Sequence, residues 1–142
     1  MKSISKASAR LLTLILMVAI LHSCSQKMQF LQSTVVPAAE GKVKLKKDNN
    51  NNYSIDLNIS NLAEPERLQP PKKNYVVWIE TEKNTFKNLG LLKSSSGFLS
   101  KALKASLNTV TSFQPKRIFI TAEDDGDINY PYGQTVLTTK EF

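Results

Sequence analysis

The sequence predicts an all-β protein, an antiparallel β-sandwich of about seven strands. Several stretches alternate apolar and polar residues with a period of two, as half-buried strands do. Turn-forming residues recur roughly every 8–12 residues, a spacing typical of sandwiches. Helical spacing of apolar residues occurs near residues 98–104, where we expect at most one short helix. The length of 142 residues and the apolar content of 41% suit one domain with a packed core.

The first two strands form a hairpin. Residues 42–46 (KVKLK) alternate charged and apolar side chains. Residues 48–52 (DNNNN) predict a turn, because Asp and Asn tolerate left-handed backbone. Residues 53–60 (YSIDLNIS) place four apolar side chains on one face and give the clearest strand signal. A strand, a turn and a strand in this order predict a β-hairpin.

The middle of the chain supplies a loop and two strands. Residues 64–73 contain three prolines and predict a loop. Residues 74–81 (NYVVWIET) are apolar on both faces, which predicts a central strand covered on both sides. Trp78 is expected in the core of such a strand. Residues 85–92 (TFKNLGLL) predict another strand, in which Gly90 permits a bulge.

The last third begins with a predicted turn at residues 94–97 (SSSG). We expect a short helical turn after it, then a strand that ends before Pro115. The remaining segments are a strand at 117–122 (RIFITA), a loop at 123–132 and a closing strand at 134–139 (QTVLTT).

The N-terminus has the pattern of a bacterial lipoprotein signal. Three basic residues precede an apolar run of eleven residues, 11–21, which is short for the ~20 residues that span a bilayer. The sequence Leu-His-Ser-Cys at 21–24 then resembles the lipobox. The resemblance implies that residues 1–23 are a signal peptide, that Cys24 is lipidated, and that Cys24 begins the mature chain. The alternatives are an uncleaved anchor with a ten-residue cytoplasmic stub and a buried free thiol.

Residues 24–41 predict a lipid-anchored tether, with a first strand at Ser33–Val36 as its end, and residues 42–142 predict the domain. The alternative for the tether is that its apolar side chains pack onto the domain. These side chains are Phe30, Leu31, Val35 and Val36.

Signal removal changes the chemistry that the chain can perform. The formal charge of +7 becomes +4, from 16 basic and 12 acidic residues. The only histidine, His22, leaves with the signal, and the only cysteine carries lipid. Ser-His-Asp, Cys-His and the usual zinc sites then cannot form. Phosphate-binding glycine motifs are absent from the sequence. We therefore expect a non-catalytic protein without metal or cofactor; a carboxylate-based enzyme is the remaining alternative.

Three segments together resemble a known family over residues 42–139. They are Tyr75–Ile79 (YVVWI), Ile118–Glu123 (IFITAE) and Pro131–Leu137 (PYGQTVL). Their order and spacing resemble the C-terminal extracytoplasmic domain of the anti-sigma-K factor family. The resemblance implies an immunoglobulin-like β-sandwich outside the cytoplasm. It does not imply sigma-factor binding, because a separate N-terminal cytoplasmic domain does this in the family, and this chain has no room for one.

Two surface features are candidate contact sites. Tyr130 and Tyr132 flank Pro131 on a predicted loop, beside the acidic residues Asp124, Asp125 and Asp127. Exposed tyrosines on loops are suited to protein contacts. The alternatives are a tyrosine that caps the core and an acidic cluster that is only solvated. We expect no calcium site, because the loop motif is incomplete.

The second feature is a basic stripe, which attracts anionic lipid headgroups. The alternative is a solvated strand face that protects a sheet edge. The stripe consists of Lys42, Lys44, Lys46 and Lys47. Nucleic acid is not an expected partner, because no arginine-aromatic platform accompanies the lysines.

The sequence therefore predicts a lipid-anchored, non-catalytic lipoprotein of the bacterial cell envelope. Its expected role is an extracytoplasmic interaction or sensory module, with anti-sigma-factor signalling as one form of that role. The expected partners are the membrane, through lipidated Cys24, and an envelope protein. The alternative is a structural lipoprotein without a specific ligand.

Overall fold

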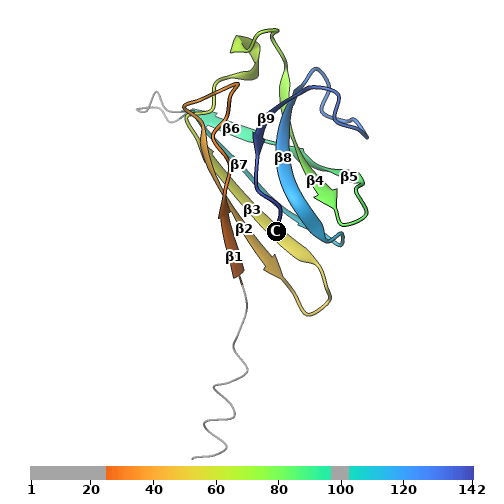
Figure 1. The fold of residues 1–142 in the computed structure, drawn as a ribbon. Coiled ribbons are helices and arrows are strands. Elements are labelled where there is room, and N and C mark those ends of the chain that lie inside the picture. The colour runs from red at the N-terminus through yellow and green to blue at the C-terminus, as the bar shows by residue number, and fades with distance from the viewer. Residues whose placement is uncertain (1–24, 97–102) are drawn as a thin grey trace, which may run out of the picture.

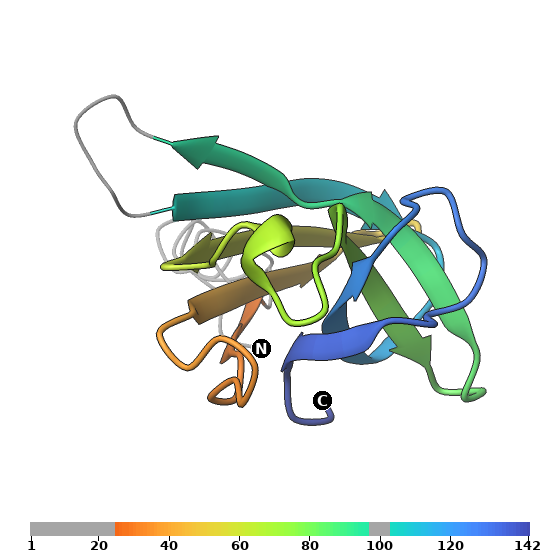
Figure 2. The ribbon, with the colours of Figure 1, turned by 90° about the horizontal axis from the view of Figure 1, so that it is seen from above.

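Two antiparallel sheets pack face to face in the computed structural model, which describes residues 25–96 and 103–142 (Figures 1 and 2). The first sheet has the strand order β1-β2-β3-β7-β6 and the second β5-β4-β8-β9. The strands are β1 (Ser25–Gln29), β2 (Glu40–Lys47), β3 (Tyr53–Ser60), β4 (Asn74–Thr81), β5 (Phe86–Leu91), β6 (Lys93–Ser96), β7 (Leu103–Thr111), β8 (Pro115–Glu123) and β9 (Gln134–Thr138). A 3-10 turn, η1 (Pro65–Arg67), lies in the proline-rich loop.

The strand order is that of an immunoglobulin-like sandwich. Strands β2, β3, β7 and β6 occupy the positions A, B, E and D of that fold, and β4, β8 and β9 occupy C, F and G. Strand β5 adds to the second sheet beside β4, as strand C′ does in variable-type domains. The predicted fold class is confirmed, with β1 as an additional strand outside β2.

The hairpin of β2 and β3 forms as predicted, and side chains in its turn explain why. The Asp48 carboxylate accepts hydrogen bonds from the N–H groups of Asn50 and Asn52, each at 2.8 Å. The bond from Asn52 holds the pKa of the Asp48 carboxyl below its ordinary value. Asn51 adopts a left-handed backbone with φ of 63°, as asparagine in a tight turn can.

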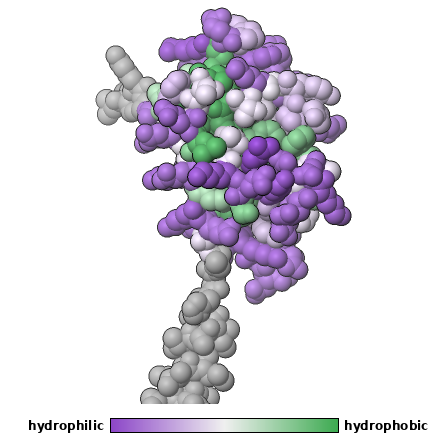
Figure 3. Space-filling view, in the orientation of Figure 1, coloured by the Kyte–Doolittle hydropathy of each residue, from purple (hydrophilic) through white to green (hydrophobic). Residues whose placement is uncertain are grey.

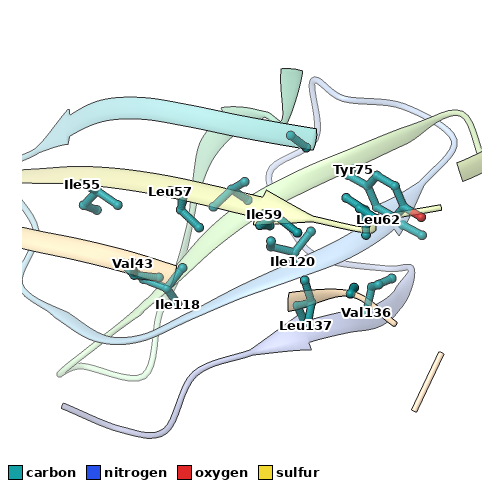
Figure 4. Close-up of a cluster of buried hydrophobic side chains, with 14 of the residues drawn as sticks. Val43, Ile55, Leu57, Ile59, Leu62, Tyr75, Ile118, Ile120, Val136 and Leu137 are labelled. Atoms are coloured by element: carbon teal, nitrogen blue, oxygen red, sulfur yellow. The ribbon is translucent and has the colours of Figure 1, made fainter. Parts of the chain in front are cut away.

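The main core lies between the sheets and is closed to solvent (Figure 4). Strands β2, β3, β4 and β8 contribute alternate residues to this core. Among the buried side chains are Val43, Ile55, Leu57, Ile59, Tyr75, Val77, Ile79, Ile118, Ile120 and Leu137. The Tyr75 hydroxyl donates a hydrogen bond to the Ala63 carbonyl at 2.9 Å. Burial, with the charge of Glu66, raises the pKa of Tyr75 to about 12. The side visible in Figure 3 is mostly hydrophilic, with apolar colour only in narrow strips.

Residues 25–41 belong to the sandwich, which corrects the tether predicted for them. Strand β1 pairs with β2 along its whole length, from Ser25 opposite Lys46 to Gln29 opposite Lys42. No strand forms at the predicted position Ser33–Val36; there the buried Ser33 hydroxyl donates to the Val136 carbonyl at 2.6 Å and accepts the Val36 N–H at 2.9 Å. The structure shows that this segment packs onto the domain, which was the alternative interpretation.

A second correction concerns residues 93–96. The predicted turn at 94–97 is wrong up to residue 96, because Lys93–Ser96 form β6 and pair with β7. The chain thus crosses from the second sheet to the first directly after β5. Of the short helix predicted near 98–104, residues 98–102 lie outside the described part, and Leu103 and Lys104 begin β7. The bulge predicted at Gly90 is present, with φ of 121° and a register shift between β4 and β5.

Candidate functional site

The outer face of the second sheet carries its own small hydrophobic cluster. Val76, Trp78 and Phe119 are buried there, and Phe86 and Ile128 pack against them. Strand β4 therefore buries both faces, as predicted, with alternate residues in the main core and in this outer cluster. Trp78 is buried, but it lies in the outer cluster and not in the core between the sheets.

The cover over this cluster is the loop between β8 and β9, residues 124–133, which we call the flap. Its middle residue Ile128 contacts the outer cluster. The Asn88 side-chain amide of β5 donates to the carbonyls of Gly126 at 3.1 Å and Ile128 at 2.9 Å. Lys72 pairs with Asp124 at 2.7 Å where the flap begins. Figure 2 shows this blue loop beside the strands of the second sheet, away from β2 and β3. The flap is thus fixed at its start and along its middle.

The end of the flap is fixed by a buried carboxylate. Glu123 is only 4% exposed. Its Oε1 accepts the N–H groups of Tyr132 at 3.2 Å and Gly133 at 2.9 Å, and the Thr121 hydroxyl at 2.7 Å. The Thr121 hydroxyl in turn accepts the indole N–H of Trp78 at 2.9 Å. Hydrogen bonds to a carboxylate are among the stronger ones in proteins, so this network joins β4, β8 and the flap.

This network unites three segments that are far apart in the sequence, residues 75–79, 118–123 and 131–137. Trp78 comes from the first, Thr121 and Glu123 from the second, and Gly133 from the third. A side chain at Gly133 would collide with the carbonyl oxygen of Ala122, so only glycine lets the backbone approach β8 this closely. The shared physical role of these residues is to hold the flap on the sheet.

An aromatic ladder leads from the outer cluster to the surface of the flap. The Phe119 and Phe86 ring centroids lie 5.6 Å apart, and those of Phe86 and Tyr130 lie 5.4 Å apart, both edge to face. The Tyr130 and Tyr132 centroids are 5.5 Å apart. Tyr130 is 51% exposed and Tyr132 is 80% exposed. Tyr130 thus also caps the outer cluster, whereas Tyr132 stands free in solvent; their role as partner contacts stays a prediction.

The acidic residues of the flap are exposed beside these tyrosines. Asp124 pairs with Lys72, and the Asp125 carboxylate accepts the N–H of Asp127 at 3.0 Å. Within residues 25–96 and 103–142, no group of three or more His, Cys, Asp or Glu side chains is arranged to hold a metal ion. The acidic residues give the flap a negative charge next to its aromatic surface.

The basic stripe divides between two faces. Lys42, Lys44 and Lys46 are exposed on the outer face of the first sheet. Lys47 lies on the opposite face of β2, over the Tyr53 ring, with its Nζ 5.4 Å from the centroid. The edge-protection alternative is wrong for β2, because β1 covers that edge.

An ion pair beside the aromatic ladder has no signal in the sequence pattern. Buried Glu80 of β4 accepts a hydrogen bond from Arg117 Nε of β8 at 2.9 Å. The Arg117 guanidinium carbon lies 5.7 Å from the Phe119 ring centroid, within the range of a cation–π contact. Both residues directly face each other across neighbouring strands, a pairing that becomes visible only once the register is known.

No known protein family, curated protein or solved structure matches this chain. Within the described residues, no helix has the length and apolar character needed to cross a membrane.

Proposed function

We propose that this protein is a lipid-anchored, non-catalytic module of the bacterial cell envelope that binds an envelope protein through the flap. The observation that carries the proposal is the exposure of Tyr130 and Tyr132 on a loop whose ends and middle are hydrogen-bonded to the sheet. Tyrosine is enriched among the residues that dominate binding energy at protein interfaces.

A fixed loop favours binding for a thermodynamic reason. Ordering side chains and loops on association opposes binding, and a pre-organised surface reduces that loss. Glu123 fixes the backbone at Tyr132, and Phe86 packs against the ring of Tyr130. The three aspartates of the flap favour a partner surface with basic or hydrogen-bond-donating groups, because complementary charge steers association.

The anchoring and the lack of catalysis rest on the sequence. The basic start, the short apolar run and Cys24 support export followed by lipidation. A mature chain that begins at Cys24 has no histidine and no free thiol, which removes the commonest nucleophile and base combinations. The motif resemblance supports a sensory role, with anti-sigma-factor signalling as one form.

Site-specific photo-crosslinking in intact cells tests the partner proposal. A photoreactive residue replaces Tyr132, and a matched probe replaces the exposed Ser112 in the loop between β7 and β8. We expect a reproducible protein adduct from position 132 that position 112 does not give. Equal labelling from both positions, or no protein adduct from position 132, would contradict the proposal and favour a structural lipoprotein without a specific ligand.

A further inference from the structure

The outer face of the first sheet gathers lysines from four strands. Strand register places Lys27 of β1 beside Lys44 of β2, and Lys93 of β6 beside Ser106 of β7, on the same face as Lys42. The lysines of this basic face are Lys27, Lys42, Lys44, Lys46, Lys93 and Lys104, and its carboxylates are Glu40 and Asp56. Only three of these lysines belong to the stripe that the sequence pattern indicated.

The excess positive charge of the domain is concentrated on this face. Six lysines against two carboxylates give the basic face a net charge of +4. The remaining described residues from Ser25 onward contain nine Lys and Arg and ten Asp and Glu, a net charge of −1. The flap contains three aspartates and no basic residue, and it lies on the outer face of the other sheet. The two outer faces of the sandwich therefore differ in charge and point in opposite directions.

The predicted anchor adjoins the basic face. Ser25, the residue after Cys24, is already in β1 and pairs with Lys46, so no flexible linker separates the proposed lipid from the sheet. The same cross-strand row continues from Lys46 to Ser54 and Val110. Val110 is 63% exposed. This row lies at the end of the sandwich where β1 begins (Figure 1).

We propose that the basic face lies on the surface of an anionic bilayer and that this orientation turns the flap away from the membrane. The proposal rests on the lipidation of Cys24 proposed above. Each lysine close to an anionic membrane strengthens the attraction about fivefold, and the effect decays within a Debye length of about 10 Å. A lipid attached directly before β1 brings the row of Lys46 inside that range. Attraction of the other lysines then lays the face flat on the bilayer surface.

Fluorescence quenching in vesicles tests this orientation. Acylated Cys24 does not react with thiol reagents, so a single introduced cysteine can be labelled selectively. The probe is placed in one protein by Ser106→Cys, on the basic face, and in another by Asn129→Cys, on the flap; both positions are exposed. The full-length protein is purified from membranes and reconstituted into vesicles that contain a lipid with a quencher on its headgroup. The vesicles are phosphatidylcholine alone, or phosphatidylcholine and phosphatidylglycerol in roughly equal parts.

We expect the probe at position 106 to be quenched at least about threefold more than the probe at 129 in anionic vesicles, because surface attraction depends on lipid charge. High salt or neutral lipid removes the difference, because the attraction is electrostatic. The triple variant Lys42→Gln, Lys44→Gln, Lys46→Gln also removes it. The matched variant Lys73→Gln, Lys83→Gln, Lys140→Gln, which loses the same charge elsewhere on the surface, retains it.

Two outcomes separate this proposal from the one on which it rests. Equal quenching of both probes in anionic vesicles, with an acylated Cys24 peptide found by mass spectrometry in the same sample, overturns the orientation and leaves the anchor intact. An unmodified Cys24 overturns the anchor and the orientation that depends on it. If the triple variant loses affinity for a soluble acidic polysaccharide but keeps its orientation on vesicles, the basic face serves a glycan instead.

Discussion

The substitution Glu123→Gln most directly perturbs the network that holds the flap. One oxygen of this buried carboxylate accepts three hydrogen bonds, from Thr121, Tyr132 and Gly133. The amide keeps the shape of the side chain but removes the charge. Hydrogen bonds to a charged group contribute about 1.5–3 kcal/mol each, against about 0.5–1.5 kcal/mol for neutral pairs. Three weakened bonds, partly offset by the easier burial of a neutral group, predict a loss of about 2 kcal/mol in the free energy of unfolding.

Urea and thermal unfolding measure this loss. For a domain of this size, about 2 kcal/mol corresponds to a fall in Tm of roughly 6–10 °C. Hydrogen exchange adds local information, because the amides of Tyr132 and Gly133 should exchange faster while those of β3 change only with global stability. The control is Glu82→Gln, which neutralises an exposed carboxylate in the turn between β4 and β5. Equal stabilities of the Glu123→Gln and wild-type proteins, with unchanged exchange at residues 132 and 133, would show that Glu123 does not hold the flap.

Gly133→Ala should destabilise the protein by at least about 2 kcal/mol in urea unfolding, because its Cβ meets backbone. Gly126→Ala should destabilise it less, since there the Cβ meets only the flexible end of Leu91. A larger loss of stability for Gly126→Ala than for Gly133→Ala would contradict the close approach of Gly133 to β8. Trp78→Ala should lower the free energy of unfolding by about 3–5 kcal/mol by emptying the outer cluster; a loss below about 1 kcal/mol would show that this cluster contributes little. The pKa of Tyr75 is higher in the folded protein than in the unfolded chain, so the fold gains stability from the neutral hydroxyl, and this gain is fully present below pH 10. It should be lost as the pH rises from 10.0 to about 12. Tyr75→Phe should remove that part of the pH dependence in urea melts; an unchanged profile would contradict the assignment.

Strands with one buried and one exposed face were predictable from the sequence. Residues 53–60 show this most clearly, because their side chains alternate between the core and solvent. Strands β1 and β6 were missed for a physical reason. Both are edge strands: β1 contributes only Met28 to the core packing, and three of the four residues of β6 are serines, which also suit turns. Such strands form because their backbone groups make hydrogen bonds with a neighbouring strand. The local sequence pattern does not show which strand becomes the neighbour.

The candidate site was predictable in part. A proline between two tyrosines on a polar loop indicated that Tyr130 and Tyr132 are exposed, and this is confirmed. Glu123 looked like the first residue of a solvated acidic loop, yet it is the buried residue that fixes the flap. The difference arises because its partners come from Thr121 and from residues 132 and 133, which meet only when β8 and the flap fold together. The apolar side chains on the second face of β4 predicted that this face is covered, but not that the flap covers it.

Quantitative co-purification measures whether the flap tyrosines bind an envelope protein. The partner identified by crosslinking is recovered with the wild-type protein and with a double variant that combines Tyr130→Ala and Tyr132→Ala. The control variant is Phe142→Ala, which removes an exposed aromatic ring away from the flap. Unfolding measurements establish that each variant is folded. We expect the double tyrosine variant to recover at least about thirtyfold less partner, as loss of an interface hot spot does, while the control recovers the wild-type amount. Recovery of the wild-type amount of partner by the folded double variant would contradict binding through the flap tyrosines.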